Sequence, residues 1–409
     1  MNQSIQTRCC VVGGGPAGMM TAFLLARMGV DVVLLEKHGD FLRDFRGDTI
    51  HASTLQLMHE LGLLEEFLKR PHQELRELSA QVGKDTLTIA DFTHLPTYCK
   101  FVALMPQWDF LNFLKQHAER YPEFHLRMET EAVDLILENE AVAGVRAKTK
   151  EGSLEIRAGL TIAADGRHSI LRERAGMEKI DLGSPMDVMW MRLSRHPDDS
   201  AQTFGHADQG KILVLLNRES YWQAALVIPK GEAEEIRRKG LESFREQIAG
   251  LEPFLRDRVQ ELRDWNHVSL LTVKVDRLKK WSRRGLLCIG DAAHAMSPIG
   301  GVGINLAIQD AVATANLLGG ILQGRAPFEK ELERVQSRRM FPTRATQGLQ
   351  VAIQNNVIRR VLGKQTALSL PWPLRILRHW KALRCIPARI VGVGFRSEHI
   401  RTPDVHAPQ

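Results

Sequence analysis

The sequence predicts an α/β protein: a parallel sheet interrupted by a second, antiparallel sheet and followed by a helical C-terminal segment. Three observations lead to this fold class. An apolar run at 9–12 enters a glycine-rich turn, and a second apolar run at 286–289 enters an acidic turn and a Pro/Gly-rich loop. Between them, from about 180 to 275, strand-like segments alternate with turns. Short apolar runs are typical of buried parallel strands, and strands separated by turns are typical of antiparallel sheets.

The composition sets broad limits on the protein. Its 409 residues are enough for two domains, or for one large domain with an insertion. No run approaches the roughly 20 apolar residues of a membrane-spanning helix, and the N-terminus has no secretory pattern. The five cysteines have neither metal-ligand nor disulfide spacing: Cys9, Cys10, Cys99, Cys288 and Cys385. We therefore expect a cytoplasmic protein with reduced cysteines, no bound metal and no nucleic-acid partner.

The N-terminal turn has the element order of a dinucleotide-binding unit. A strand at 9–12 leads into Gly13-Gly14-Gly15-Pro16-Ala17-Gly18, which has the form G-x-G-x-x-G. A helix is expected from Ala17 to Met28, and a second strand at 31–35 ends at Glu36. This strand–turn–helix–strand order predicts a Rossmann-like fold.

Four residues of this unit have separate expected tasks. Gly13 permits the tight turn, Gly15 lets a pyrophosphate approach the backbone, and Gly18 allows the helix to pack closely on the strand. Glu36 stands where a carboxylate binds ribose hydroxyls, which favours FAD or NAD over NADP.

A second motif points to a flavin. The strand at 286–289 runs into Gly290-Asp291-Ala292-Ala293-His294, and Pro298-Ile299-Gly300-Gly301-Val302-Gly303-Ile304-Asn305 follows at the start of a helix. A carboxylate at a strand end, here Asp291, can accept hydrogen bonds from ribityl hydroxyls. Glycines let backbone N–H groups approach a flat ring, and a helix N-terminus favours the negative charge of a reduced flavin.

Two further motifs complete the pattern. Asp165-Gly166-Arg167-His168-Ser169-Ile170-Leu171-Arg172 has the form DG-x-x-S-x-x-R, and Arg46-Gly47-Asp48-Thr49-Ile50-His51 is an arginine-led segment. Together the motifs resemble those of the FAD-dependent aromatic hydroxylases, the p-hydroxybenzoate hydroxylase-like flavoprotein monooxygenases, over about residues 7–350. The resemblance implies a Rossmann-like FAD-binding domain of the glutathione-reductase type with an inserted antiparallel substrate domain.

The resemblance also implies roles for single residues. Arg172 is expected to help dock NADH or NADPH. Catalytic residues are not identified, but four candidates are expected near the flavin: Arg46, His51, His294 and Pro298. For the two histidines, a proton relay and a structural hydrogen bond both remain open. The residues expected to bind FAD are Gly13, Gly15, Pro16, Ala17, Gly18, Glu36, Lys37, Arg46, Gln107, Asp165, Asp291, Pro298, Gly301, Val302, Gly303, Ile304 and Asn305. Gln107 is expected to open a helix that ends at Ala118.

The chemistry implied by the resemblance needs NADH or NADPH together with O2. The nicotinamide reduces FAD, O2 adds to give a C4a-hydroperoxide, and the terminal oxygen passes to an electron-rich carbon of an aromatic, quinone-precursor or polyketide-like substrate. No second dinucleotide-binding turn is expected, because Gly392-Val393-Gly394 is followed by no predicted helix. This argues against reductases with two dinucleotide folds and is consistent with transient nicotinamide docking.

The motifs divide the chain into four expected parts. Residues 1–178 and 276–355 form the FAD-binding domain, 179–275 form the substrate sheet, and 356–409 form a basic helical segment. Residues 75–104 are expected to add strands to the substrate sheet. Candidate substrate contacts are Trp190 and Arg192 on one strand and Tyr221 and Gln223 on another, the alternative being that this face packs on the FAD domain. The sequence shows no conspicuous arginine–tyrosine pair of the kind that would indicate a carboxylated phenol as the substrate.

The C-terminal segment carries an excess of positive charge, with ten Lys/Arg and one acidic residue between 356 and 401. A helix from Arg375 to Ile386 would place its basic residues opposite an apolar half made of Ile376, Leu377, Trp380, Leu383 and Ile386. Such a helix either packs on its own FAD domain or lies on an anionic membrane, which would suit a lipophilic substrate. The chain is expected to be a monomer or a homodimer.

Three other functions use related folds or cofactors. A flavin halogenase is disfavoured because the chain lacks W-x-W-x-I-P. An isoprenoid reductase would share the FAD motifs and suit the basic C-terminus, and it would not consume O2. A non-catalytic flavin-binding redox sensor would not need the DG motif.

Overall fold

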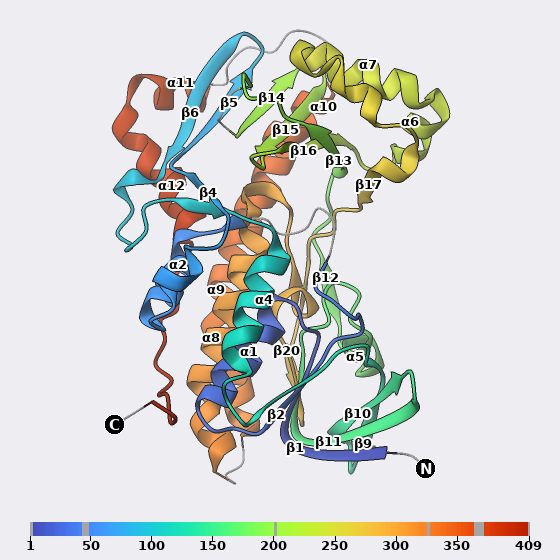
Figure 1. The fold of residues 1–409 in the computed structure, drawn as a ribbon, viewed down its shortest axis with the longest axis vertical. Helices are drawn as coiled ribbons and strands as arrows, with labels where there is room; N and C mark the ends of the chain where they lie inside the picture. The colour runs from blue at the N-terminus through green and yellow to red at the C-terminus, as the bar shows by residue number, and fades with distance from the viewer. Residues whose placement is uncertain (1–2, 43–48, 200–202, 325–327, 364–371, 408–409) are drawn as a thin grey trace.

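The computed structural model describes residues 3–42, 49–199, 203–324, 328–363 and 372–407. Two bodies are visible in Figure 1: an α/β body with both termini below, and a second sheet above. The long helices α8 (Val302–Gln323) and α9 (Glu329–Ile353) lie side by side in the α/β body, and the chain continues from α9 toward the second sheet. The mixed α/β class expected from the sequence is confirmed.

The lower sheet has a parallel core in the order β20-β11-β1-β2-β8, with β19 antiparallel at one edge. Strands β1, β2, β11 and β20 are apolar and almost fully buried near their carboxyl ends, as a sheet covered on both faces requires. The hairpin of β9 and β10 extends β11. The strands are β1 (Gln3–Val12), β2 (Val32–Leu35), β8 (Phe124–Arg127), β9 (Glu131–Glu138), β10 (Ala141–Thr149), β11 (Gly152–Ala163), β19 (Ser282–Arg283) and β20 (Leu286–Cys288).

Helices cover the lower sheet and surround its glycine turn. Helix α1 begins at Pro16 and ends at Arg27, so the expected helix is present with its start shifted by one residue. Helix α4 begins at Gln107, as the sequence predicts. The helices of this body are α1 (Pro16–Arg27), α2 (Ala52–Glu60), α3 (Leu64–Phe67), α4 (Gln107–Ala118), α5 (Ile170–Arg174), α8 and α9.

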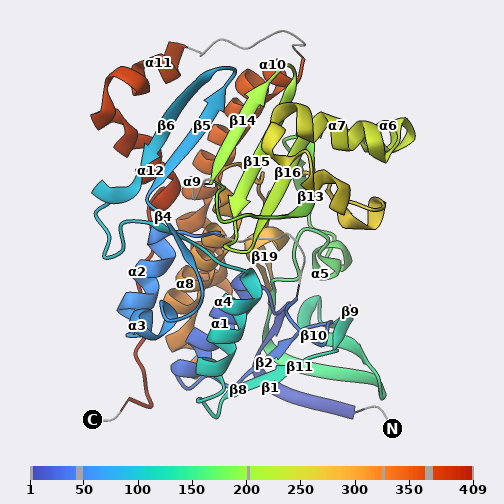
Figure 2. The same ribbon diagram turned by 45° about the horizontal axis from the view of Figure 1, so that its top comes forward.

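The upper sheet has seven strands in the order β17-β13-β16-β15-β14-β5-β6 (Figure 2). It is antiparallel except between β14 and β5, which are parallel, so the expectation of a wholly antiparallel sheet is wrong there. Because β5 comes from the first half of the chain, no tight turn joins it to β14 and forces the antiparallel direction. The strands are β5 (Glu77–Val82), β6 (Asp85–Asp91), β13 (Met186–Ser194), β14 (Phe204–Asp208), β15 (Lys211–Asn217), β16 (Tyr221–Pro229) and β17 (Val268–Leu271).

Two parts of the substrate region differ from the sequence-based expectation. Strand β7 (Val102–Leu104) does not join the upper sheet but pairs with β3 (Thr49–Ile50) and β4 (Gln73–Leu75). The chain between β16 and β17 is helical, with α6 (Ala233–Lys239) and α7 (Leu241–Leu251) packed on one sheet face. The opposite face is therefore the one that turns toward the α/β body, where Ile299 packs against the same apolar cluster as Trp190.

A small three-stranded sheet joins the two bodies. It pairs β12 (Lys179–Asp181) with β18 (Asp276–Leu278), and β18 with β21 (His294–Ala295). The segment after β12 enters the upper sheet, and the segment after β21 forms the Pro/Gly-rich loop. Both ends of the substrate sheet are thus attached close to this loop.

The C-terminal segment is not the single helix expected from Arg375 to Ile386. Helix α11 (Trp372–His379) ends before Trp380, whose backbone leaves the helical region at φ −111° and ψ 84°, and α12 (Cys385–Gly392) starts separately after a 3-10 turn. The break arises because the chain folds against β6 instead of running along the FAD domain, with Arg378 pairing with Asp85 at 2.8 Å. Before it, a π-turn (Gln354–Ile358) joins α9 to α10 (Arg359–Leu362). Within the described ranges, no helix has the length and apolar character needed to cross a bilayer.

Candidate active site

The carboxyl ends of β1, β11 and β20 meet at one edge of the parallel sheet and bring three sequence motifs together. Gly13 has φ +105°, and a Cβ there would overlap the carbonyl oxygen of Ala164, directly before Asp165. Gly290 has φ +58°, and a Cβ on it would lie 3.0 Å from Ala17 at the start of α1. The glycine turn, the DG motif and the acidic turn therefore form one site, at the position where α/β sheets bind ligands.

In the glycine turn, one glycine is required for close packing and another borders open space for a ligand. A Cβ at Gly18 would overlap the carbonyl oxygen of Gly13, so close packing excludes any side chain. A Cβ at Gly15 would meet no atom within 4 Å, and Gly15 caps α1 with ordinary backbone angles and without a side-chain hydrogen bond. Open space before an uncapped helix N-terminus is suited to a pyrophosphate, and Pro16 at the first helical position removes one surplus N–H donor.

Glu36 lies at the end of β2, beside the glycine turn, with 8% of its surface exposed. Its carboxylate accepts hydrogen bonds from the backbone N–H of Gly14 (3.0 Å) and of His38 (3.0 Å). The His38 ring contacts it at 2.6 Å. The carboxylate is thus oriented toward the turn that would hold a dinucleotide, while Lys37 is exposed.

Arg172 joins the DG motif to the acidic turn through hydrogen bonds. Its guanidinium is buried and donates to the carbonyl oxygens of Ala292 (2.9 Å) and Arg167 (2.8 Å). Arg172 is therefore engaged within the protein, and its role in nicotinamide docking stays a prediction. Arg167 is the more exposed arginine of the motif, and it lies 3.5 Å from the carboxylate of Asp291. Burial raises the pKa of Asp165, whose Oδ1 accepts no hydrogen bond from the described part of the chain.

A buried ion network supports the acidic turn from behind. One oxygen of Asp310 accepts from the Gly290 N–H (3.1 Å) and contacts Nε2 of His294 (2.5 Å), and the other accepts from Arg339 (2.9 Å). Burial alone would raise the pKa of Asp310, but the charges of His294 and Arg339 lower it below its usual value. Arg339 also reaches Glu398 in the C-terminal tail. His294 therefore connects structural elements, and its place near the flavin stays a prediction.

The Pro/Gly-rich loop is joined to the arginine-led segment by Asn305. The Asn305 side chain accepts from the His51 N–H (2.8 Å) and donates to the carbonyl oxygens of Thr49 (3.0 Å) and Gly301 (3.3 Å). Gly301 is left-handed, and a Cβ there would overlap the Thr49 hydroxyl. Arg46 lies outside the described residues. Pro298 caps a short turn before α8, where Val302, Gly303 and Ile304 are half-buried.

His51 is also a connecting residue. Its Nδ1 lies 2.7 Å from the carbonyl oxygen of Val391 in α12, and the residue is 1% exposed. Burial lowers the pKa of His51 to about 4, so the ring is neutral at pH 7. A buried, neutral ring held on a carbonyl oxygen favours the structural hydrogen bond over the proton relay, and this assignment stays a prediction.

The four candidate substrate residues share the sheet face opposite α6 and α7. Trp190 and Arg192 on β13 lie opposite Ala225 and Gln223 on β16, and Arg192 stacks over the Tyr221 ring at 4.0 Å. An arginine–tyrosine contact is therefore present, although no such pair was conspicuous in the sequence. The pair was not evident in the sequence because the two residues are 29 positions apart and meet only through strand pairing. Gln223 is buried and accepts from Arg218 at 3.0 Å.

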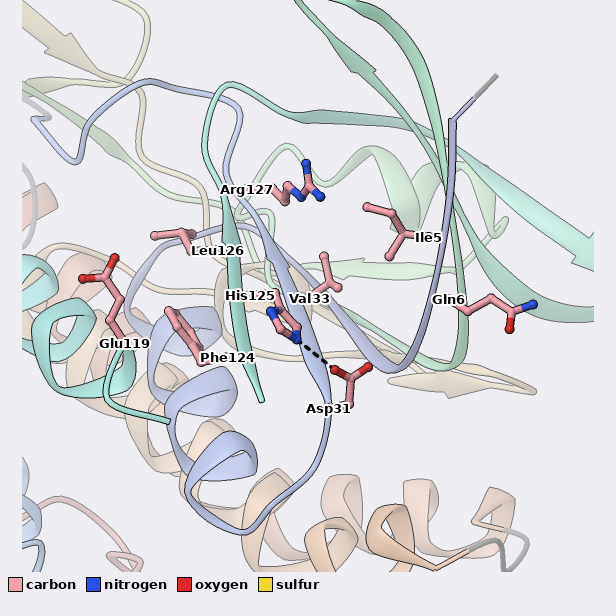
Figure 3. A pocket seen from close by; sticks show the side chains of 9 residues that line it. All are labelled: Ile5, Gln6, Asp31, Val33, Glu119, Phe124, His125, Leu126 and Arg127. Carbon is pink, nitrogen blue, oxygen red and sulfur yellow. Dashed lines mark hydrogen bonds and ion pairs between the residues drawn. The ribbon is translucent and has the colours of Figure 1, made fainter. Parts of the chain in front are cut away.

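Two surface pockets lie away from these motifs. One of about 540 Å³ is formed over β1, β2 and β8, where His125 and Asp31 are paired at 3.0 Å (Figure 3), and it includes none of the glycine-turn residues. The other, of about 670 Å³, lies between the start of β13 and the π-turn after α9. Among the described residues, no group of His, Cys, Asp and Glu side chains is placed to hold a metal ion.

Several residues of the site were not identified from the sequence. Arg167 and Arg339 carry contacts that the DG motif and the acidic turn need. Three buried glutamines, Gln347 and Gln350 of α9 and Gln354 at the start of the π-turn, bind the loop before Pro298. Their i, i+3, i+7 spacing places them on one helix face, and this polar stripe was the available signal.

Comparison with known proteins supports this geometry. Residues 6–348 match the family described as FAD binding domain. The 6-methylpretetramide 4-monooxygenase of Streptomyces rimosus is 32% identical over 400 residues, covering 97% of this chain and 94% of the relative. Para-nitrophenol 4-monooxygenase of Pseudomonas sp. is 25% identical, covering 77% of this chain and 78% of the relative.

Solved structures share the fold. PqsL of Pseudomonas aeruginosa, described as a probable FAD-dependent monooxygenase, superposes with a TM-score of 0.74 at 21% identity, covering 87% of this chain and 98% of its own. The anhydrotetracycline hydroxylase OxyS of Streptomyces rimosus gives 0.73 at 19% identity, covering 95% and 76%. The open glycine turn fits FAD, and the chain belongs to the FAD binding domain family as an FAD-dependent oxidoreductase of the p-hydroxybenzoate hydroxylase-like superfamily.

Proposed function

We propose that the protein uses NADH or NADPH and O2 to hydroxylate an aromatic or polyketide-like substrate. The observation that carries the proposal is the meeting of the glycine turn, the DG motif and the acidic turn in one site, with a neighbouring sheet face that carries polar and aromatic side chains. A relative that is 32% identical over nearly the whole chain is named as 6-methylpretetramide 4-monooxygenase, which supports a polyketide-like substrate.

In this proposal, bound FAD supplies the redox chemistry, and the chain positions the reactants. The α1 N-terminus and Glu36 bind the adenosine diphosphate part, and Asp291, held by Arg167, binds the ribityl hydroxyls. On the substrate side, Trp190 and Tyr221 offer ring faces, while Arg192 and Gln223 offer hydrogen bonds to phenol or enol oxygens. The sheet covers the site and keeps water from the reacting centre.

The test is a coupled measurement on the purified yellow protein. NADH and NADPH oxidation, O2 consumption and H2O2 release are recorded together across phenols, quinone precursors and polycyclic phenols. We expect one class to stimulate NAD(P)H oxidation with O2 consumed and little H2O2 released, and mass spectrometry to find a product heavier by one oxygen atom. NAD(P)H oxidation without O2 consumption would instead favour a reductase, and no stimulation by any class would favour a redox sensor.

Peripheral membrane contact is a second, separate proposal. Trp380 is 68% exposed and Ile386 53% exposed, on a segment without acidic residues between Arg375 and Ser397. Exposed apolar and basic side chains together are suited to an anionic bilayer. Flotation with vesicles rich in phosphatidylserine should recover the wild-type protein and less of Trp380→Ala, while Leu137→Ala, which removes an exposed apolar side chain elsewhere, should behave as wild type. Equal recovery of all three proteins would refute this contact.

A further inference from the structure

The loop at 296–301, which we call the flavin loop, has little secondary structure of its own. Strand β21 ends at Ala295, and the next short turn begins at Ile299. Backbone N–H and C=O groups that are buried outside helices and sheets need other partners, because leaving them unsatisfied is costly. At the start of this loop, several of these partners come from α9 and the π-turn that follows it.

Gln350 provides the central contact. Its side-chain oxygen accepts from the backbone N–H of Ser297 (3.1 Å), and its nitrogen donates to the carbonyl oxygens of Ser297 (2.9 Å) and Ile299 (3.0 Å). One side chain therefore satisfies three backbone groups of the flavin loop. Gln350 is 3% exposed and Ser297 is 2% exposed, so water does not readily replace these bonds.

Gln347 and Gln354 flank Gln350 and form further hydrogen bonds next to its contacts. Gln347 donates to the carbonyl oxygens of Ala295 (3.1 Å) and Asp276 (2.8 Å), which fixes the entry to the loop. Gln354 donates to the Ser297 hydroxyl (2.8 Å) and to the Ser184 hydroxyl (3.3 Å), just before β13 enters the substrate sheet. Gln354 is also the first residue of the π-turn, a feature that often marks functional sites.

We propose that Gln347, Gln350 and Gln354 form a buried glutamine rail that sets the position of the flavin loop, and with it the environment of the FAD ring. They are positioning residues, since they act through the loop and do not face the ligand. This inferred role of the rail rests on the proposed function, in which FAD binds beside the loop. Because the test reads FAD binding and not turnover, a failed hydroxylation assay leaves it unaffected.

The same helix offers a matched control. Gln336 accepts from the Trp281 backbone N–H (3.0 Å) and donates to the Lys279 carbonyl oxygen (2.8 Å), so it makes the same kind of contact to a segment outside the flavin loop. Gln336 is half-buried, so water can replace part of what its leucine variant loses, whereas the groups paired with Gln350 are buried. Gln336→Leu therefore tests whether losing a glutamine–backbone contact on α9 is enough by itself to change FAD binding.

The experiment compares Gln350→Leu with Gln336→Leu by FAD titration, the visible spectrum of the bound flavin, its midpoint potential and thermal unfolding. We expect Gln350→Leu to raise the FAD dissociation constant about tenfold and to shift the spectrum and potential, since unpaired buried groups displace the loop. Gln336→Leu should lower the unfolding temperature and leave the FAD readouts at wild-type values. Equal FAD readouts in the two variants would overturn the rail.

Gln350→Glu is the second variant, and it also covers a leucine variant that does not fold. The carboxylate would face two carbonyl oxygens, whereas the protonated acid regains a donor. FAD affinity should therefore be weak at pH 8 and recover as the pH falls, because burial raises the pKa of such a carboxyl group. Affinity that stays at the wild-type value across this pH range would also overturn the proposal.

Discussion

Around the glycine turn, polar side chains such as Asp310, Arg339 and Arg172 are buried and bind a neighbouring motif. On the substrate face, by contrast, Arg192 is exposed and rests on the ring of a half-buried tyrosine. A buried network tolerates little change, because removing one member leaves the charge or dipole of another member buried without a partner. An exposed contact can change at small cost. This difference explains why the motifs specify the cofactor and leave the substrate open.

The largest expected effect breaks the buried side of the comparison. Asp310→Ala removes the partner of Arg339 and His294, and breaking a buried ion pair costs about 3–5 kcal/mol. Urea unfolding of the apoprotein measures the loss. Arg157→Ala, at the exposed pair with Glu138, should leave the urea midpoint unchanged. If Asp310→Ala unfolds at the wild-type midpoint, the network does not stabilise the acidic turn.

His51 gives the next largest effect, through pH. Burial lowers the pKa of His51 from 6.5 to about 4, so the folded state excludes a proton that the unfolded state binds between these values. This contribution is fully present above pH 6.5 and is lost as the pH falls toward 4, by roughly 3 kcal/mol at most. His51→Gln should lose stability less steeply than wild type between pH 7 and 4.5 in urea unfolding. Identical pH slopes would contradict the assignment.

The glycine turn allows ligand binding to be separated from packing. Gly15→Val places a side chain in open space at the α1 N-terminus, so FAD affinity should fall about a hundredfold while apoprotein unfolding is unchanged. Gly18→Ala overlaps the Gly13 carbonyl oxygen, so the apoprotein itself should lose stability. FAD titration and thermal unfolding of both apoproteins check the pair. A Gly15→Val apoprotein as unstable as Gly18→Ala would show that Gly15 is also a packing residue.

The smallest effect is expected on the substrate face. Arg192→Met removes an exposed cation–π contact, which contributes about 0.5–1 kcal/mol. Stability and FAD affinity should therefore stay close to wild type, while KM should rise for the compound that the protein hydroxylates. Steady-state kinetics with FAD titration provides the measurement. Loss of FAD from this variant would place Arg192 on the cofactor side and remove the contrast between the two regions.

The sequence by itself determined the features whose cause is local. The glycine turn could be read because Gly13 must adopt a positive φ and Gly18 must lack a side chain, whatever the rest of the chain does. Helix α4 could be placed at Gln107, and the three long strands of the substrate sheet could be found, because hydrophobic periodicity follows the backbone.

Only the tertiary structure decided how distant segments meet. The parallel β14–β5 pair, the Arg192–Tyr221 contact and the break of the C-terminal helix at Trp380 all arise from contacts between segments far apart in the chain or joined only by sheet pairing. Burial of Arg172 and the glutamine rail have the same origin, since each side chain binds a group 50 or more positions away in the chain. Such bonds depend on where elements pack, and packing is a property of the whole chain and not of local propensity.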